Sequence, residues 1–187
     1  MSERPDRFTD RLFFALRPDA ATVTRIEAVR DRLRAEQGLL AQPLPVQQLH
    51  VTLHHLGDFV RFPQELADKA MAAAATLSAP AFELTLDQAL SFKRREARSR
   101  PCVLLAGGEG LVALKAFHAQ LVAALKAAGL YRYASFTPHL TLLYDAIGVE
   151  QQPIEPITWT ANEFVLVNSL LGKTEHVVLA RWPLQTA

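Results

Sequence analysis

The chain contains the same arrangement of segments twice, and this internal repeat limits the possible folds more than any other feature. In each copy an apolar segment precedes a helical pattern, which is followed by a strand-like segment carrying His-x-Thr. Phe14 lies 36 residues before His50, and Leu104 lies 35 residues before His139. Two similar units that share a core pack most simply about an approximate two-fold axis. The repeat therefore predicts an α+β fold with two lobes related by a pseudo-two-fold axis.

Hydrophobic periodicity gives the elements expected within this frame. Alternating and apolar segments predict strands at 11–16, 49–58, 81–92, 102–106, 136–144, 162–171 and 175–182. Helical spacing predicts helices at 20–37, 64–77 and 111–128. Asp19 and Gly38 are placed to begin and end the first helix. Because no linker rich in Pro, Gly or Ser interrupts the chain, we expect one domain over 1–187, with lobes built from about 11–100 and 101–187.

Composition excludes several classes of protein. Twenty Lys and Arg residues against nineteen Asp and Glu leave a net charge of +1, so binding to nucleic acid would need a local basic patch. Half of the residues are hydrophobic and 21% are charged, which excludes intrinsic disorder. The single cysteine, Cys102, excludes an internal disulfide framework and a cysteine-rich metal cluster.

Targeting signals are also missing from the sequence pattern. The first ten residues are polar and lack the apolar stretch of a signal peptide. No apolar run approaches the roughly 18 residues that are needed to span a membrane. We therefore expect a soluble, cytoplasmic, monomeric protein that does not bind membranes.

The two His-x-Thr motifs, at His50 and Thr52 and at His139 and Thr141, carry the strongest functional signal. Side chains alternate between the two faces of a strand, so each histidine shares a face with its threonine, while the apolar residues between them face the other way. A pseudo-two-fold axis can bring the two polar faces together. We therefore expect both imidazoles and both hydroxyls in one cleft.

Such a set of side chains suits displacement at phosphorus. Imidazole titrates near neutrality, so one histidine can take a proton from a nucleophile while the other gives a proton to the leaving group. The two hydroxyls can donate hydrogen bonds to an anion held between the rings. The quasi-symmetric motifs leave open which histidine is the acid. No phosphate-binding loop, carboxylate cluster or cysteine set with ligand spacing accompanies them, so we expect neither a metal nor another cofactor.

Further residues are candidates for contacts with RNA. His54 falls on the face of His50 and Thr52 by simple alternation, although a place at a solvent-exposed strand end is the alternative. The segment 93–100, KRREARSR, holds five basic residues in eight and is either a solvated loop or a contact for phosphates. Phe136 could stack on a base or pack beneath the strands. The candidate RNA contacts are His54, Arg94, Arg95, Arg98 and Phe136.

Beyond the paired motifs, several segments make the chain resemble a known family over about residues 11–184. The matching segments are Arg11–Leu16, Leu49–Gly57, Phe136–Leu143, Ser169–Gly172 and Arg181–Leu184. With these segments the chain resembles the 2H phosphoesterase superfamily, named for its two His-x-Thr-x motifs. Within that superfamily it is most similar to the RNA 2',3'-cyclic phosphodiesterases, also called 2'-5' RNA ligases.

The resemblance implies a fold and an activity. The fold has two antiparallel sheets facing a central cleft, with helices outside. The activity is metal-independent hydrolysis of 2',3'-cyclic phosphate ends of RNA or oligonucleotides to 2'-phosphomonoesters, with 2'-5' ligation as the reverse reaction. By the same resemblance, His50 is the proton donor, His139 is the proton acceptor, and Thr52 and Thr141 bind the phosphate.

The chain departs from the family pattern at three positions. His55 stands where many relatives carry an aromatic residue, Tyr144 where many carry arginine, and His176 where tyrosine is frequent. Two other functions therefore stay open: a phosphodiesterase for another small nucleotide substrate, and a non-catalytic RNA-binding module. The intact motifs argue against the second, because binding alone needs no acid–base pair.

Overall fold

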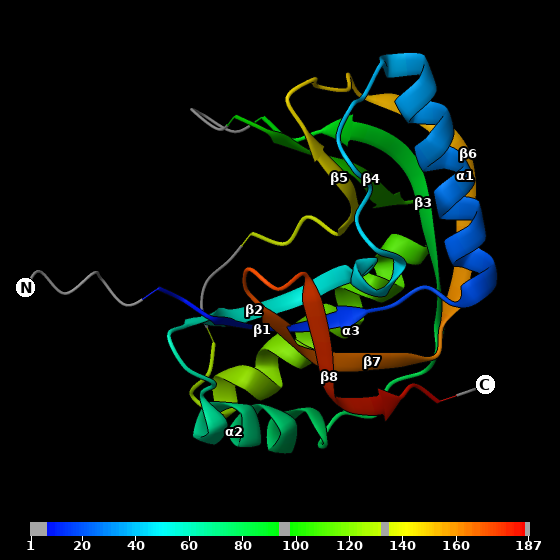
Figure 1. Cartoon of the computed structure of the whole chain (residues 1–187). Helices are drawn as coiled ribbons and strands as arrows, with labels where there is room; N and C mark the ends of the chain where they lie inside the picture. The colour runs from blue at the N-terminus through cyan, green and yellow to red at the C-terminus, as the bar shows by residue number, and fades with distance from the viewer. Residues whose placement is uncertain (1–6, 94–97, 132–134, 186–187) are drawn as a thin grey trace, which may run out of the picture.

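The computed structural model describes residues 7–93, 98–131 and 135–185, and the fold in this part of the chain is a long antiparallel sheet flanked by helices (Figure 1). The strands are β1 (Asp10–Leu16), β2 (Val51–Phe59), β3 (Phe82–Ser91), β4 (Arg100–Gly107), β5 (His139–Asp145), β6 (Gln152–Ala161), β7 (Glu163–Leu170) and β8 (Glu175–Pro183). The helices are α1 (Ala20–Gln37), α2 (Gln64–Ala74) and α3 (Gly110–Ala127), with a 3-10 turn η1 (Val46–Gln48).

The eight strands form one sheet in the order β6-β3-β4-β5-β2-β1-β7-β8. Two halves of four strands meet where β2 pairs with β5, and there the ladder has a single residue pair, Val51 with Leu140. In one half β2 lies at the junction and β1 lies next to it; in the other half β5 lies at the junction and β4 lies next to it. In each half, the strand at the junction is therefore the second strand of a sequence repeat, and its neighbour is the first. The antiparallel α+β class is confirmed, but the two expected sheets are joined into one.

The prediction that the lobes correspond to residues 11–100 and 101–187 is wrong. Strand β7 lies beside β1 and β8 lies beside β7, although both come from the end of the chain, and β3 lies beside β4. Each repeat supplies only two neighbouring strands, so the outer strands of each half must come from elsewhere in the sequence. Both halves therefore contain strands from both parts of the chain.

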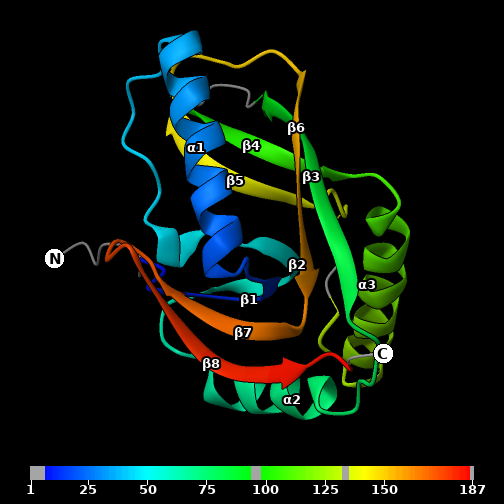
Figure 2. The same ribbon diagram turned by 90° about the vertical axis from the view of Figure 1, so that its right-hand side faces the viewer.

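The helices lie outside the sheet, as expected. Helix α1 runs along β6, and the Arg25 guanidinium of α1 donates hydrogen bonds to the carbonyls of Pro156 and Thr158 in that strand (Figure 2). Helix α3 packs against β3 and against α2. One large cluster of buried apolar residues includes side chains from both halves and all three helices, so the lobes share a core.

The ends of α1 follow the sequence signals. The Asp19 side chain accepts a hydrogen bond of 2.7 Å from the Thr22 amide, which satisfies one free donor of the first turn and lowers the pKa of the carboxyl. Gly38 has φ of 66°, a left-handed conformation that favours glycine, and the chain leaves the helix there. The predicted start and stop are confirmed.

Strand β6 is an element that the sequence pattern did not predict. It contains Pro153 and Pro156, which cannot donate a ladder hydrogen bond and so argue against a strand. The structure places β6 at the edge of the sheet, where it pairs only with β3. One side of an edge strand makes no ladder bonds, and this is why the prolines are tolerated there.

Among the described helices, α3 is long and apolar enough by length and composition to cross a membrane, with a mean hydropathy of 1.2. Its Leu114, Phe117, Leu121 and Leu125 are buried in the core. These four side chains form the face with which α3 packs on β3 and α2, and 22% of the stretch is buried. The expectation that the protein does not bind membranes stays a prediction.

A buried carboxylate connects the segment before β2 to the end of β5. Asp145 accepts hydrogen bonds of 2.7 Å from the amides of Leu40 and Ala41, and one of 2.9 Å from the amide of Ile147. These bonds lower the pKa of its carboxyl. The Leu44 amide also donates to a β5 carbonyl, at 2.9 Å. The chain leading to His50 is thereby held against the strand that begins at His139.

Replacing this carboxylate should therefore destabilise the fold. Asp145→Ala leaves three amides without their acceptor, and a hydrogen bond to a charged group contributes roughly 1.5–3 kcal/mol. We expect a loss of about 3 kcal/mol, which lowers the melting temperature by roughly 6–12 °C in thermal melts. Asp68→Ala is the control, because that carboxylate is exposed on α2 and, among the described residues, accepts only from Gln64. Equal melting temperatures for Asp145→Ala and the wild type would contradict the role of this tether.

Candidate active site

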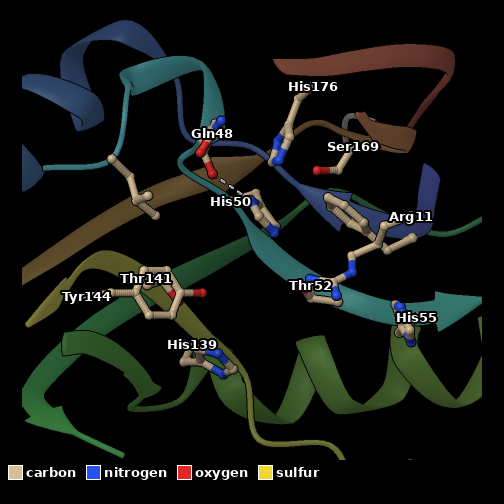
Figure 3. A pocket seen from close by; sticks show the side chains of 12 residues that line it. Arg11, Gln48, His50, Thr52, His55, His139, Thr141, Tyr144, Ser169 and His176 are labelled. Carbon is tan, nitrogen blue, oxygen red and sulfur yellow. Dashed lines mark hydrogen bonds between the residues drawn. The ribbon is translucent and has the colours of Figure 1, made fainter. Parts of the chain in front are cut away.

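A cavity of about 480 Å³ lies across the junction of the two half-sheets (Figure 3). Both predicted motifs reach it, since His50, Thr52, His139 and Thr141 all line its wall. The remaining lining residues are Arg11, Phe13, Leu44, Gln48, His55, Tyr144, Ser169 and His176. The sequence prediction that four motif side chains share one cleft is therefore confirmed in its geometry, while their chemical roles stay predictions.

Each of the two motif histidines is held by a carbonyl two residues earlier. The Nδ1 of His50 lies 2.6 Å from the Gln48 carbonyl oxygen, and the Nδ1 of His139 lies 2.7 Å from that of Thr137. A carbonyl oxygen can only accept, so Nδ1 carries the hydrogen in both rings. In the neutral tautomer this leaves Nε2 unprotonated and available to a ligand. The two half-sheets therefore present their imidazoles as the same tautomer, with the hydrogen on Nδ1.

Aromatic rings pack against both imidazoles and help to fix their orientation. Phe13 stacks on His50, with ring centroids 4.7 Å apart and an interplanar angle of 26°. Phe92 meets His139 edge to face, with centroids 4.8 Å apart. Such arrangements are favoured by the quadrupole of the aromatic ring. Each catalytic candidate is thus held by a backbone carbonyl and by a phenylalanine.

The cavity disfavours a positive charge on His50. Burial of the imidazole, together with the nearby His176, His139 and Arg17, lowers its pKa to about 4, although the bond to Gln48 acts in the opposite direction. Burial and Arg17 also lower the pKa of His176. Both rings are therefore neutral at pH 7 in the free protein.

The prediction that His54 shares the cavity face is wrong, and a β-bulge is the reason. Strand β1 pairs with Thr52 and His54 as successive positions, so Leu53 is an extra residue in β2. His54 then turns to the interior, where it is 4% exposed and stacks on Tyr131 at 5.7 Å. The next residue, His55, faces the cavity instead.

His55 belongs to a charged group at the cavity wall. Arg11 donates two hydrogen bonds of 2.7 Å to the Asp58 carboxylate, and His55 Nε2 lies 3.0 Å from the same carboxylate. The bond from Arg11 is the main reason why the pKa of Asp58 falls to about 2. The charge of Arg11 is therefore already balanced within the protein.

The other candidate RNA contacts have different outcomes. Phe136 does not line the cavity; its half-buried ring stacks on His118 of α3, with centroids 3.7 Å apart and an interplanar angle of 3°. Phe136 is therefore a packing residue, and the prediction that it contacts RNA in the cavity is wrong. Arg98 is exposed and outside the cavity wall. Arg94 and Arg95 lie outside the described residues, so their RNA contacts stay predictions.

Several cavity residues were missed as site residues by the sequence analysis. Arg11 and Phe13 share one face of β1 by alternation, and the single arginine of the otherwise apolar segment 11–16 was the available signal. His55, Tyr144 and His176 were noted only as departures from the family pattern. The structure brings all three departures into the one cavity.

Comparisons with known proteins identify the family and the fold of the chain. The sequence model of the 2'-5' RNA ligase superfamily matches residues 17–173. The fold is similar to the crystal structure of E. coli LigT, with a TM-score of 0.72 and 27% identity over 96% of this chain and 99% of that chain. TT0787 of Thermus thermophilus has a TM-score of 0.72 at 22% identity, covering 94% and 98%. Usb1 of Kluyveromyces marxianus shares the fold at 11% identity and a TM-score of 0.55, covering 94% and 99%. No curated protein sequence matches the chain.

The fold and the paired motifs thus define a phosphoesterase of the two-histidine type. Because the family model matches residues 17–173, most of the chain, the protein belongs to the 2'-5' RNA ligase superfamily. LigT itself has been crystallised with ATP, 3'-AMP, NADP+ and phosphate.

His54, which is buried on the interior side of β2, should make the stability of the fold depend on pH. The Nε2 of His54 has no hydrogen-bond partner among the described residues, and burial lowers its pKa to about 4. The unfolded chain protonates this ring near pH 6.5 and the folded chain does not, so stability falls as the pH drops from 6.5 towards 4. His50 adds to this loss in the same direction.

We expect that His54→Leu reduces this acid sensitivity. Between pH 7 and pH 5 the wild type should lose about 1–2 kcal/mol of stability through His54, and the variant should lose that much less. Urea denaturation at the two pH values measures the difference. Parallel stability curves for the wild type and His54→Leu would rule out a pKa depressed by burial.

Proposed function

We propose that the protein is a metal-independent phosphodiesterase that hydrolyses 2',3'-cyclic phosphate ends of RNA or oligonucleotides to 2'-phosphomonoesters. One observation carries the proposal: two imidazoles from different half-sheets line one cavity, and both offer Nε2 because Nδ1 is bound to a carbonyl. Thr52 and Thr141 line the same cavity beside them. Membership of the superfamily supports the same reaction class.

In the proposed reaction, water attacks the phosphorus of the cyclic phosphate from the side opposite to the 3'-oxygen. His139 Nε2 takes a proton from that water as the new P–O bond forms. His50 Nε2 gives a proton to the 3'-oxygen as the P–O3' bond breaks. The hydroxyls of Thr52 and Thr141 donate to the non-bridging oxygens, where charge builds up in the transition state. Proton exchange with solvent then restores both rings.

His50 can act as an acid only when the bound substrate raises its pKa enough for the ring to take up a proton. In the free protein the pKa of His50 is about 4, so the ring is neutral at pH 7. A cyclic phosphate carries a negative charge, which raises the pKa of an imidazole beside it. The assignment of His50 as donor and His139 as acceptor follows the resemblance, and a bound anion is the condition under which His50 can serve as an acid.

The partner that we propose is the end of an RNA or oligonucleotide carrying the cyclic phosphate. A 5'-hydroxyl in the place of water would give 2'-5' ligation in the same cavity. Crystals of LigT with 3'-AMP, ATP and NADP+ support a nucleotide as the ligand. A cavity completed within one chain supports a monomer, and we propose a cytoplasmic location and no cofactor.

A second candidate is a phosphodiesterase for another small nucleotide. His55, Tyr144 and His176 depart from the family pattern and all line the cavity, so the groups around the phosphate differ from those of many relatives. Turnover of a panel of 2',3'-cyclic nucleotides and cyclic-phosphate RNA ends decides between the two candidates.

The acid–base pair can be tested by substitution. His50→Ala and His139→Ala should each lower the turnover of a 2',3'-cyclic phosphate about 10²–10⁴-fold, the usual size for a positioned proton carrier. The double variant should lose less than the product of the two, because both residues act in one step. Thr52→Ala and Thr141→Ala should lose less than either histidine variant, since each removes only a hydrogen bond.

These assays are run in excess chelator, because the proposed reaction needs no metal, and thermal melts exclude loss of folding. His118→Gln is the control, since that histidine lies on α3 outside the cavity wall. Near-wild-type turnover of either motif histidine variant would remove that residue from the mechanism.

The basic segment provides a separate test of the RNA partner. Replacing Arg94, Arg95, Arg98 and Arg100 with Ala should weaken turnover of long RNA about tenfold more than that of a cyclic mononucleotide, and high salt should shrink the difference. Replacing the exposed pair Lys69 and Lys115, on α2 and α3, provides a control that removes half as much positive charge. An equal loss on both substrates would mean that the segment does not bind the RNA chain.

A further inference from the structure

The cavity contains a third imidazole that the two-histidine mechanism does not use. His176 of β8 is paired with Ser169 of β7, which is paired with Arg11 of β1, so these three positions form one row across the half-sheet. All three line the cavity. The ring centroid of His176 lies 5.4 Å from that of His50 and 5.5 Å from that of Phe13 (Figure 3). His176 is therefore an immediate neighbour of a catalytic candidate.

The ring nitrogens of His176 are available to a ligand. No described residue forms a hydrogen bond with either nitrogen, and the side chain is only half-buried. A neutral imidazole always has one donor nitrogen and one acceptor nitrogen, and a protonated imidazole has two donors. An anion in the cavity would favour the form with two donors.

The cavity wall is rich in hydrogen-bond donors and in imidazoles that can become cationic when an anion binds. Its described lining includes Arg11, four histidines, two threonines and Tyr144, but no carboxylate. The neighbouring carboxylate, Asp58, is bound to Arg11 and His55. Such a wall matches a ligand that carries more than one negative charge.

The groups around His176 are either neutral or positive. They are His50 just before β2, His139 on β5 across the cavity, Arg17 just after β1, and Arg11 on β1, whose charge Asp58 balances. Ser169 on β7 is uncharged. With no anion bound, these groups disfavour a proton on His176, whereas a bound dianion reverses the sign of the local potential.

We propose that His176 is a third phosphate-binding imidazole, which becomes protonated when the cavity binds a phosphomonoester dianion. The inference rests on the proposed function, because the phosphomonoester is the product of ring opening. A monoester phosphate carries close to two negative charges above its second pKa of about 6, whereas the cyclic diester carries one. His176 would therefore make the cavity hold the product more tightly than the substrate, so that product release becomes dependent on pH.

The experiment is titration calorimetry at pH 7.5 with inorganic phosphate and, separately, with a nucleoside 2'-monophosphate. Each titration is made in two buffers of different ionisation enthalpy, which gives the number of protons taken up on binding. The variants are His176→Phe, which keeps an aromatic ring, and His176→Gln, which keeps a hydrogen-bond donor but cannot be protonated. His118→Gln, outside the cavity, controls for the loss of a histidine.

We expect that His176→Phe weakens binding of both ligands about tenfold and lowers proton uptake below that of the wild type. His176→Gln should recover part of the affinity but none of the proton uptake, and His118→Gln should match the wild type. The phosphate ligand can itself change its protonation on binding. This contribution is the same for every variant, so it cancels when the proton uptake of a variant is compared with that of the wild type. Wild-type affinity and wild-type proton uptake in both His176 variants would overturn the proposal.

Turnover of 2',3'-cyclic nucleotides by the same preparations separates this inference from the proposed function. A wild type that binds phosphate with proton uptake but hydrolyses no cyclic phosphate would refute the proposed function and leave the His176 site standing. A wild type that hydrolyses the substrate, with His176 variants unchanged in affinity and proton uptake, would refute the His176 site alone.

Discussion

The single residue pair that joins β2 to β5 is the contact on which the geometry of the site depends. Val51 and Leu140 are both 0% exposed, so they point into the core. Side chains alternate along a strand, and the residues on either side of each must therefore face the opposite way. This places His50 and Thr52 opposite His139 and Thr141 in one cavity. Two apolar side chains at the junction thus fix the direction of four polar ones.

The site holds two imidazoles, His50 and His176, in surroundings that disfavour their protonated form when no ligand is bound. Burial holds His50 neutral, His176 shares its surroundings, and Asp58 rather than a substrate balances Arg11. The described lining of the cavity has hydrogen-bond donors and no carboxylate. A bound anion accepts hydrogen bonds from these donors and raises the pKa values of His50 and His176 together. The electrostatics of the cavity therefore favour an anionic ligand.

Membership of the superfamily does not by itself specify the substrate, since one fold can support many activities. The scaffold aligns with LigT over nearly the whole chain, whereas His55, Tyr144 and His176 set the chemistry of the cavity wall. They stand beside the paired motifs on the wall of the same cavity. These three residues therefore bear on the ligand that we propose, while the paired motifs bear on the proposed reaction.

Local features of the protein could be predicted from the order of its residues: the repeat, the capped helix α1, most strands and the paired motifs, because periodicity and capping depend on near neighbours. The order of the strands could not, since β7 and β8 complete the half-sheet of β1 through pairings between residues far apart in the chain. The same long-range pairings make β6 an edge strand, which can therefore contain prolines. Pairing with β1 also places the bulge at Leu53, which turns His54 inward and brings His55 to the cavity. Register is a property of two strands together, and so no single strand could reveal it.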